Sequence, residues 1–470
     1  MPPKFGTSGL RGLVTELTQD LVTAHVAAFV RSCPVGSGVF VAHDLRRSSP
    51  AIAGWVARAG QAAGLTVTTC GPVPTPALAL AAMQAGAAAV MITGSHIPDD
   101  RNGLKFYTPD GEITKPHETA ILAALTDAPV RSASVGAAAV ANTTAGAEYC
   151  ARYVRAYGAK ALTGLRIGVY THSAVGRDLT LSVLAALGAA VVDLGRADRF
   201  IPVDTEAVDA ETRASLRAWA ATGRFDAIVS TDGDGDRPLM TDAAGLVVPG
   251  DVLGQITAAA LRADTVVTPV SSNTGLEASG RFARTLRTRI GSPHVIAGMQ
   301  EAAGRVVGYE ANGGFLLGFA AVGPAGLLPP LMTRDALLPL IAPLVAARGP
   351  DGWRDGGLAA RVAAEPPRFT AADRLQDVPS DLGQALVARL DADAAARAVF
   401  LADFGTEQAV DRTDGLRVTL HGGGIVHLRP SGNAPELRCY AEAESQPAAD
   451  ALLARGLAAL AQALPRARGA

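Results

Sequence analysis

Three apolar runs that each lead into a polar loop constrain the fold of this chain more than any other feature of its sequence. They span residues 38–41, 165–170 and 265–268, and each is followed by a helical pattern and then by another apolar run. Strands and helices alternating at this spacing predict α/β layers, whose functional loops gather at the ends of strands. The pattern alone leaves open whether the units are true repeats, because α/β proteins often look self-similar at this level.

The second apolar run of each unit ends in a loop with its own chemistry. The serine loop (residues 93–98) contains Thr-Gly-Ser-His, the aspartate loop (residues 232–237) contains three aspartates, and the glutamate loop (residues 308–314) contains a Glu and an Asn. Three units of this kind can bring their loops to one cleft.

The aspartate loop indicates a metal site. Asp232, Asp234 and Asp236 alternate with glycines. Carboxylates this crowded repel one another by roughly 1 to 4 kcal/mol per pair unless a cation lies among them. Oxygen ligands suit Mg²⁺ better than zinc. An EF-hand is excluded because it needs Gly and Glu where this chain has Arg237 and Ala243. A solvated acidic turn is disfavoured because an apolar run leads straight into the loop.

Ser95 is a candidate nucleophile because it follows an apolar run, beside Gly94, which permits close backbone approach. The motif G-x-S-x-G is absent, and adjacent side chains of an extended chain point apart, so a catalytic pair with His96 is disfavoured. A turn predicted at residues 101–103 places Lys105 near Ser95 as a source of charge or of a proton. The alternatives are a serine that only caps a turn and a solvated lysine.

The segment 429–438, called here the anion cradle, combines two arginines with small hydroxyl and amide side chains and a glycine. Arginine binds phosphate in a bidentate fork, and successive backbone N–H groups form a concave anion nest. A plain Ser-Gly-Asn turn with surface arginines is the alternative.

The C-terminal part of the chain follows a different pattern, beyond a predicted linker at residues 348–353. Apolar runs at 416–420 and 425–428 predict a hairpin, with a third strand at 437–441. A leucine stripe from Leu453 to Leu464 predicts a last helix, so this end is expected to be a small α+β domain.

Composition argues against several partners. The net charge is −2 and charged residues make up 18% of the chain, so we expect neither nucleic acid nor an anionic membrane as partner. Residues 311–333 carry no charge, but their glycines and prolines predict loop and buried turn rather than a membrane helix. The cysteines form no CxxC pair and the N-terminus lacks the apolar core of a secretory signal, so a reducing, cytoplasmic location is expected.

Together these loops resemble the α-D-phosphohexomutase family, which comprises phosphomannomutases, phosphoglucomutases and phosphoglucosamine mutases. Residues 4–12 are similar to its N-terminal motif, 93–98 to its phosphoserine loop, and 232–237 match its magnesium loop without change. Residues 308–314 correspond to its sugar-recognition loop and 429–432 to the start of its phosphate loop. The motifs occur in family order across nearly the whole chain.

The chain also departs from the family pattern. Ile97 replaces the usual Asn of the phosphoserine loop, and Asn433-Ala434 replaces the usual Thr-Glu, so a weaker supporting hydrogen bond is expected at each place. Asn312 stands where many members have Ser, and the Asp-Gly pair beyond the third loop is present only as Asp335-Ala336.

The resemblance implies interconversion of hexose 6-phosphate and hexose 1-phosphate, with phosphorylated Ser95 as donor and a 1,6-bisphosphate that turns end for end. It implies one Mg²⁺ ion, glucose or mannose 1,6-bisphosphate as activator, a hexose phosphate substrate, and a monomer or homodimer. The implied catalytic residues are Ser95, His96, Lys105 and Arg11, and the implied metal ligands are Ser95, Asp232, Asp234 and Asp236. The implied substrate-binding residues are Arg237, Glu310, Asn312, Gly313, Arg429, Ser431, Gly432, Asn433 and Arg438.

The predicted fold is three similar α/β domains with mixed sheets and a smaller C-terminal α+β domain, around a central cleft. We expect a phosphoserine domain at 1–140, a magnesium domain at 141–248, a sugar-recognition domain at 249–350 and a phosphate-binding domain at 360–470. The first and third loops look most like phosphomannomutase members, with phosphoglucomutase or phosphoglucosamine mutase as alternatives. A different class also remains open, either a Mg-dependent phosphatase with an Asp nucleophile or a non-enzymatic cation-binding module.

Overall fold

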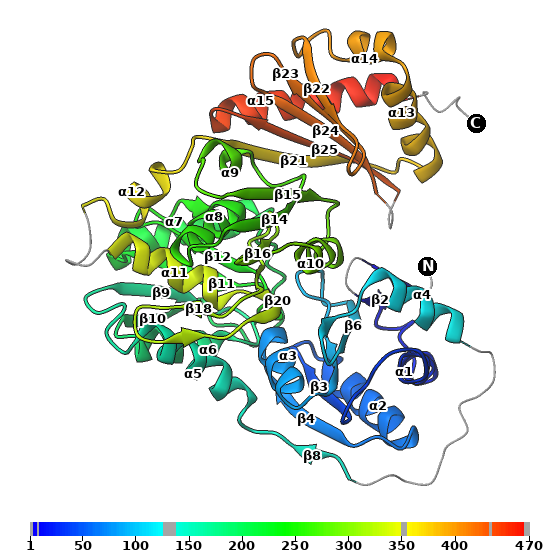
Figure 1. Cartoon of the computed structure of the whole chain (residues 1–470), viewed down its shortest axis with the longest axis vertical. Coiled ribbons are helices and arrows are strands. Elements are labelled where there is room, and N and C mark those ends of the chain that lie inside the picture. The colour runs from blue at the N-terminus through cyan, green and yellow to red at the C-terminus, as the bar shows by residue number, and fades with distance from the viewer. Residues whose placement is uncertain (1–2, 7–8, 126–137, 349–354, 432–434, 465–470) are drawn as a thin grey trace. The chain divides into compact units, whose positions relative to one another are not determined.

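The first strands predicted for the three units are β3 (Val39–His43), β9 (Arg166–Tyr170) and β14 (Thr265–Pro269) in the computed structural model. The structure describes residues 3–6, 9–125, 138–348, 355–431 and 435–464 (Figure 1). It divides into two units, of which the first comprises residues 1–267 and 291–364 and the second residues 268–290 and 365–470. The predicted linker lies largely outside the described residues.

The first sheet has the order β1-β2-β6-β5-β3-β4-β8, with β7 paired to β6. Helices cover both of its faces, which buries every residue of the apolar strand β5. The other strands are β1 (Lys4–Phe5), β2 (Leu10–Leu13), β4 (Val67–Pro72), β5 (Ala88–Ile92), β6 (Arg101–Thr108), β7 (Gly111–Glu112) and β8 (Val140–Ala141). The helices are α1 (Gln19–Ser32), α2 (Ser49–Ala62), α3 (Thr75–Gln84) and α4 (Lys115–Ala124).

The second sheet of the first unit has the order β10-β9-β11-β12-β13. Its strands β9, β10 and β11 are parallel, whereas β12 returns antiparallel to β11. The remaining strands are β10 (Ala190–Leu194), β11 (Ala227–Thr231), β12 (Pro238–Thr241) and β13 (Val247–Val248). The accompanying helices are α5 (Ala145–Tyr157), α6 (Arg177–Ala186) and α7 (Ala210–Gly223).

The third sheet repeats this arrangement, with β16 parallel to β14 and β17 antiparallel to β16. The strand β20 pairs with β17, and β18 and β19 form a separate two-stranded ribbon. These strands are β16 (Val306–Tyr309), β17 (Phe315–Leu317), β18 (Ala321–Val322), β19 (Leu327–Leu328) and β20 (Leu331–Asp335). The helices are α8 (Gly250–Ala260), α10 (Ser292–Glu301), α11 (Leu337–Arg348) and α12 (Gly357–Ala363).

The three loops singled out in the sequence occupy the same place in their sheets. Each follows a strand that is parallel to the first strand of its unit, namely β5, β11 or β16, and precedes the antiparallel strand that pairs with it. The repetition that the sequence left open is therefore present in the topology. The prediction of similar α/β domains with mixed sheets is confirmed.

The second unit contains a fully antiparallel sheet of order β21-β25-β24-β23-β22. The predicted hairpin and third strand are confirmed as β23, β24 and β25, and the last helix packs its buried side on the sheet. The elements are β15 (Arg284–Thr288), β21 (Phe369–Gln376), β22 (Glu407–Asp411), β23 (Leu416–Leu420), β24 (Ile425–Pro430), β25 (Glu436–Ala443), α9 (Gly275–Ala278), α13 (Ser380–Ala392), α14 (Ala394–Phe400) and α15 (Gln446–Ala463).

Two local predictions were wrong. Residues 311–333 are not only loop and turn, because β17, β18 and β19 lie within them and β20 begins there; short strands tolerate the intervening glycines and prolines that a helix does not. Residues 101–103 do not form a turn, because they pair with β2 as the start of β6. Within the described part of the chain, none of the helices combines the length and apolar character that crossing a membrane would need.

Candidate active site

Ser95 lies in the turn between β5 and β6, where the chain reverses direction. Its backbone is left-handed, with φ of 55°, and its side chain is fully buried. The Ser95 N–H donates to Thr93 Oγ1 (2.7 Å), whose hydroxyl donates in turn to Asp44 Oδ2 (2.8 Å). A chain of hydrogen bonds from the end of β3 thus fixes the unusual backbone of the serine.

Arg46 supports the same turn from its carbonyl side. Its guanidinium pairs with Asp44 and donates to the carbonyl oxygens of Ser95 (3.1 Å) and Ile97. The ring of Phe200 lies 3.8 Å from the guanidinium carbon, so the arginine is held between an aromatic ring and the turn. Asp44 and Arg46 were not among the residues predicted from the sequence, although both follow the end of an apolar strand.

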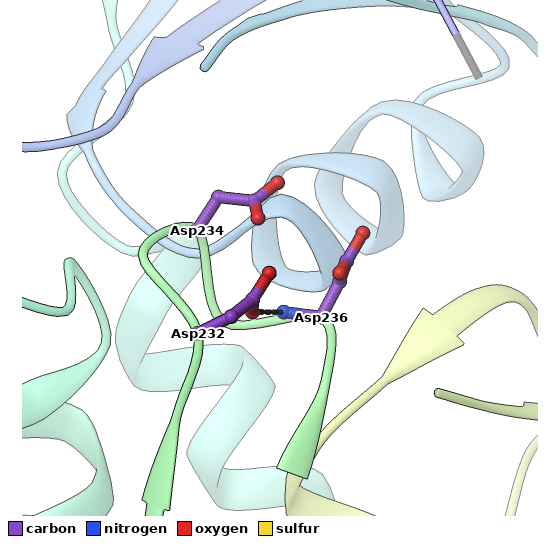
Figure 2. A group of neighbouring side chains, drawn as sticks. All are labelled: Asp232, Asp234 and Asp236. Atoms are coloured by element: carbon purple, nitrogen blue, oxygen red, sulfur yellow. Dashed lines mark hydrogen bonds between the residues drawn. The ribbon is translucent and has the colours of Figure 1, made fainter. Parts of the chain in front are cut away.

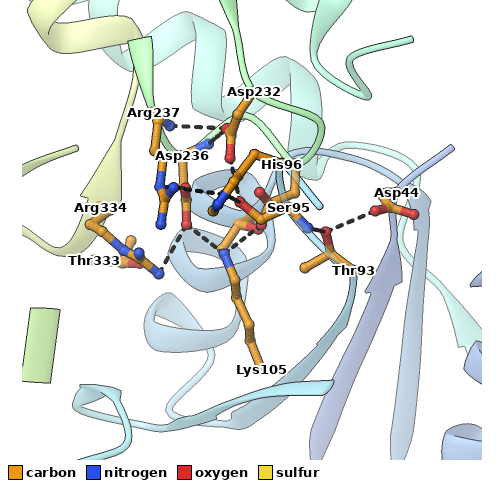
Figure 3. Close-up of polar contacts among 12 residues, drawn as sticks. Asp44, Thr93, Ser95, His96, Lys105, Asp232, Asp236, Arg237, Thr333 and Arg334 are labelled. Carbon is orange, nitrogen blue, oxygen red and sulfur yellow. Dashed lines mark hydrogen bonds and ion pairs between the residues drawn. The ribbon is translucent and has the colours of Figure 1, made fainter. Parts of the chain in front are cut away.

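The aspartate loop meets the serine loop directly. Ser95 Oγ donates to Asp232 Oδ2 at 2.6 Å, as Figure 3 shows. Oxygen atoms of Asp232, Asp234 and Asp236 all lie within 4.8 Å of one another (Figure 2). The other Asp232 oxygen accepts from the backbone N–H groups of Asp236 and Arg237, both at 3.2 Å, and these bonds close the loop on itself.

Lys105 joins the cluster from β6, which pairs with the strand that precedes Ser95. Its Nζ donates to Asp234 Oδ2 and to Asp236 Oδ2, each at 2.6 Å. Thr75 Oγ1 also donates to Asp234 Oδ2, at 2.6 Å. The structure therefore brings together the serine, the lysine and the three aspartates that the sequence singled out.

The electrostatics of the aspartates fit a hard divalent cation. Burial and the charges of Asp234 and Asp236 raise the pKa of Asp232 well above its ordinary value. Burial would raise the pKa of Asp234 too, but the Lys105 ammonium outweighs it and holds that pKa far below its usual range. Among the described residues, Asp234 Oδ1 and Asp236 Oδ1 are buried without a hydrogen-bond donor. Carboxylate oxygens that accept no hydrogen bond are the ligands that Mg²⁺ prefers.

His96 does not point away from Ser95, so that expectation was wrong. The left-handed turn at Ser95 removes the alternation of an extended chain, and His96 Nδ1 lies 3.3 Å from Ser95 Oγ. The same nitrogen accepts from Arg237 Nη1 at 2.8 Å. Burial and the charge of Arg237 lower the pKa of His96 to about 3, so its ring is neutral near pH 7. Ser95 Oγ donates to Asp232 (Figure 3), and His96 Nε2 lies 3.9 Å from Asp204 Oδ2, beyond hydrogen-bond distance, so Ser95, His96 and Asp204 do not form a Ser-His-Asp triad.

The glutamate loop is held by its own backbone. Asn312 Oδ1 accepts from Gly314 N (3.0 Å), Gly313 N donates to the Glu310 carbonyl (2.9 Å), and Gly313 has a φ of 85°. Burial raises the pKa of Glu310. Thr205 Oγ1 donates to the Asn312 carbonyl at 3.0 Å, so the second α/β layer braces this loop.

Two cations complete the cluster in the first unit. Arg11, on β2, has a pKa lowered to about 10 by burial and by the charges of Arg237 and Arg334. Arg334, on β20, is 2% exposed and forms an ion pair with Asp236 at 3.0 Å. Arg334 was not predicted from the sequence, where the available signal was a charged pair, Arg334-Asp335, at the end of a long uncharged stretch.

The anion cradle belongs to the second unit. Arg429 and Arg438 are register partners on β24 and β25, and Ser431 N donates to the Glu436 carbonyl at 2.9 Å. Arg429 Nε lies 2.8 Å from Asp414 Oδ2, and Arg438 Nη2 lies 3.4 Å from Glu436 Oε2. Residues 432–434, and with them Gly432 and Asn433, lie outside the described residues.

Family models and known relatives match most of the chain. Models of phosphoglucomutase/phosphomannomutase match residues 2–130 (alpha/beta/alpha domain I), 249–348 (alpha/beta/alpha domain III) and 377–458 (C-terminal domain). A phosphomannomutase from Sinorhizobium fredii is 46% identical over 98% of this chain and 99% of its own length. A phosphomannomutase from Salmonella muenchen is 43% identical over 94% of this chain and 92% of its own length.

A solved structure shows the same fold. The putative phosphomannomutase from Thermus thermophilus superposes with a TM-score of 0.74 and 22% identity, covering 98% of this chain and 99% of the other.

Proposed function

The chain belongs to the phosphoglucomutase/phosphomannomutase family, and from this membership we propose that it interconverts mannose 6-phosphate and mannose 1-phosphate. The observation that carries the proposal is the contact of Ser95 Oγ with Asp232, inside a cluster that Lys105 closes. A hydroxyl beside three carboxylates and a lysine suits phosphoryl transfer, where positioning and electrostatics supply most of the rate enhancement.

In this proposal Ser95, when phosphorylated, donates its phosphoryl group to a sugar hydroxyl. Asp232, Asp234, Asp236 and a phosphoserine oxygen would hold Mg²⁺, which supplies charge neutralisation for the transferring group. Lys105, bonded to Asp234, and Arg11, whose guanidinium is within electrostatic reach of Asp234 and Asp236, assist by balancing negative charge. His96, neutral and accepting from Arg237 at Nδ1, orients that guanidinium beside Ser95.

We propose that the remaining residues predicted from the sequence bind the sugar and its phosphate. Glu310, Asn312 and Gly313 read the hydroxyls, with Arg237 beside them, and the two arginines of the anion cradle with Ser431 bind the phosphate already on the sugar. Gly432 and Asn433 are proposed to contribute to the same cradle. The 1,6-bisphosphate then turns end for end and returns its other phosphate to Ser95.

Mannose is placed first because the two relatives at 46% and 43% identity are named phosphomannomutases. Mannose and glucose differ at one hydroxyl. If the protein does not bind that hydroxyl, it loses only about 1 to 3 kcal/mol of discrimination between the two sugars. Activity on glucose phosphates is therefore part of the proposal.

We also propose four further properties of the protein. They are a 1,6-bisphosphate activator, a monomer or homodimer, a cytoplasmic location, and the division into domains at 1–140, 141–248, 249–350 and 360–470. The four free cysteines support a reducing compartment, since structural disulfides mark oxidising ones.

Turnover of mannose, glucose and glucosamine 1-phosphates, with Mg²⁺ and a trace of 1,6-bisphosphate, tests the function by ³¹P NMR. The expected result is conversion to the 6-phosphates, fastest with mannose, with no free phosphate. Ser95→Ala should nearly abolish it. Release of inorganic phosphate that survives Ser95→Ala would instead establish the phosphatase, and metal binding without any hexose phosphate binding would establish a cation-binding module.

A further inference from the structure

Arg334 contacts carboxylates from three separate elements of the first unit. Its Nη2 lies 3.0 Å from Asp236 Oδ2, in the aspartate loop. Its Nε lies 3.4 Å from Glu112 Oε1, on β7, and its Nη1 lies 3.6 Å from Glu310 Oε2, in the glutamate loop. Figure 3 shows the Arg334 guanidinium directed at Asp236. The side chain is 2% exposed, which leaves little room for a ligand to contact it.

Glu112 anchors Arg334 in this position. Its Oε1 accepts from Thr333 Oγ1 at 3.2 Å and from the Arg334 backbone N–H at 3.3 Å, and its Oε2 accepts from Ser292 Oγ at 2.7 Å. Burial would raise the pKa of Glu112, but the charge of Arg334 and the bond from Ser292 lower it, so the carboxylate stays ionised. Glu112 therefore holds Arg334 both by its negative charge and by hydrogen bonds to neighbouring residues.

The contacts close into a ring. Glu112 on β7 pairs with Tyr107 of β6, and β6 also carries Lys105. Lys105 binds Asp236, Asp236 binds Arg334, and Arg334 returns to Glu112. In such a ring a shift of Asp236 displaces Arg334, and Glu310, the third carboxylate on that guanidinium, is displaced with it.

We propose that Arg334 is a positioning residue that couples the aspartate loop to the glutamate loop, so that cation binding and hexose phosphate binding strengthen each other. The inference rests on the proposed function for the identity of the two ligands. A cation that orders Asp236 also orders Arg334 and Glu310. The hexose phosphate then binds residues that are already ordered, and its binding carries a smaller entropy cost. Arginine is suited to this role because its planar fork reaches several carboxylates at once, whereas lysine offers a single point charge.

The test is a linkage measurement on dephosphorylated protein, whose state is verified by intact mass. Calorimetry gives the dissociation constant of mannose 1-phosphate with and without saturating Mg²⁺. Electron paramagnetic resonance gives the Mn²⁺ dissociation constant with and without the sugar phosphate. Coupling between two sites is reciprocal, so both measurements must return the same sign. For the natural sequence we expect each ligand to tighten the other by about fivefold or more.

Arg334→Lys is expected to reduce this factor by about threefold or more, because a single ammonium keeps the charge but cannot occupy both the Nη2 position at Asp236 and the Nη1 position at Glu310. Direct attraction between the cation and the phosphate remains, so the factor should fall rather than vanish. Glu112→Gln, which keeps the shape of the anchor and removes its charge, is expected to act in the same direction and carries the test if the first variant does not fold.

Arg152→Lys is the matched control. Arg152 is 3% exposed and donates to the Pro329 carbonyl at 2.8 Å, outside the ring. It should lower the thermal midpoint and leave the coupling factor unchanged. Folded Arg334→Lys and Glu112→Gln proteins with the natural coupling factor would overturn the inference, as would a natural protein without coupling. Binding with coupling but without turnover would overturn the mutase alone, and a chain that binds no hexose phosphate would overturn both.

Discussion

Ser95 Oγ lies 2.6 Å from Asp232 Oδ2, although 137 positions separate the two residues in the chain. The contact joins the loop after β5 to the loop after β11, which occupy equivalent places in two sheets of the same topology. A reactive hydroxyl and a cluster of carboxylates thus meet because the same α/β layer is used twice.

Asp236→Asn should weaken Mn²⁺ binding by more than about tenfold, since changes even to the partners of metal ligands cost 10- to 100-fold. The variant replaces a carboxylate that carries one of the two aspartate-loop oxygens buried without a hydrogen-bond donor in the described part of the chain. Titration followed by electron paramagnetic resonance measures it directly. Asp100→Asn, an exposed carboxylate outside the cluster, is the control and should bind Mn²⁺ as the natural protein does. Equal affinities in the two variants would remove the metal site from the aspartate loop.

Arg46→Lys should lower kcat by about 10- to 100-fold with little change in KM. A displaced Ser95 hydroxyl slows the transfer step, whereas the contacts that bind the substrate are unchanged. The single ammonium of lysine cannot occupy both the Nη1 position that contacts Asp44 and the Nη2 position that contacts the two carbonyl oxygens, so the turn that carries Ser95 loosens. Steady-state kinetics with mannose 1-phosphate measures the split. Arg47→Lys, at the neighbouring exposed position, serves as the control. A variant whose kcat equals that of the control would show that Arg46 has no part in placing the serine.

The sequence predicted the chemical groups of the site better than the residues that hold those groups in place. Ser95, Lys105 and the aspartates could be found because they sit in short, recognisable loops at strand ends. Arg46, Glu112 and Arg334 could not, because each acts through contacts with residues far away in the chain. His96 was misjudged for a local reason: a left-handed residue does not follow the alternation of a strand.

Gly233→Ala should disturb the site from within the metal motif. A Cβ at Gly233 would lie 2.6 Å from the Ser95 carbonyl oxygen and 2.8 Å from the Phe200 ring, closer than Cβ atoms approach other heavy atoms in proteins. The neighbouring loops must then move apart, at a cost of about 1 to 3 kcal/mol in unfolding free energy. Gly54→Ala is the contrasting control, since its Cβ meets only Arg58 Nη1 at 3.5 Å within α2 and should stabilise the helix by about 0.5 to 1 kcal/mol. Thermal unfolding that moves both variants in the same direction would contradict the close approach at Gly233.

His427 should make the second unit sensitive to acid. It is 1% exposed on β24, stacked on Tyr440 with 5.1 Å between ring centroids, and burial, with the charge of Arg417, lowers its pKa from 6.5 to about 4. Between these values the unfolded chain binds the proton and the folded unit does not. The contribution of His427 to the free energy of unfolding is therefore fully present above about pH 6.5. It is lost, by about 3 kcal/mol, as the pH drops toward 4.

Hydrogen exchange of peptides from β24 and β25, corrected for the intrinsic pH dependence, follows this loss. His427→Gln should flatten the profile between pH 6.5 and 4, because glutamine carries no titrating group. His421→Gln is the control and should leave the profile as it is, since the His421 side chain is exposed to solvent. The same acid response in both variants would mean that groups other than the buried His427 ring set the stability of the sheet in this range.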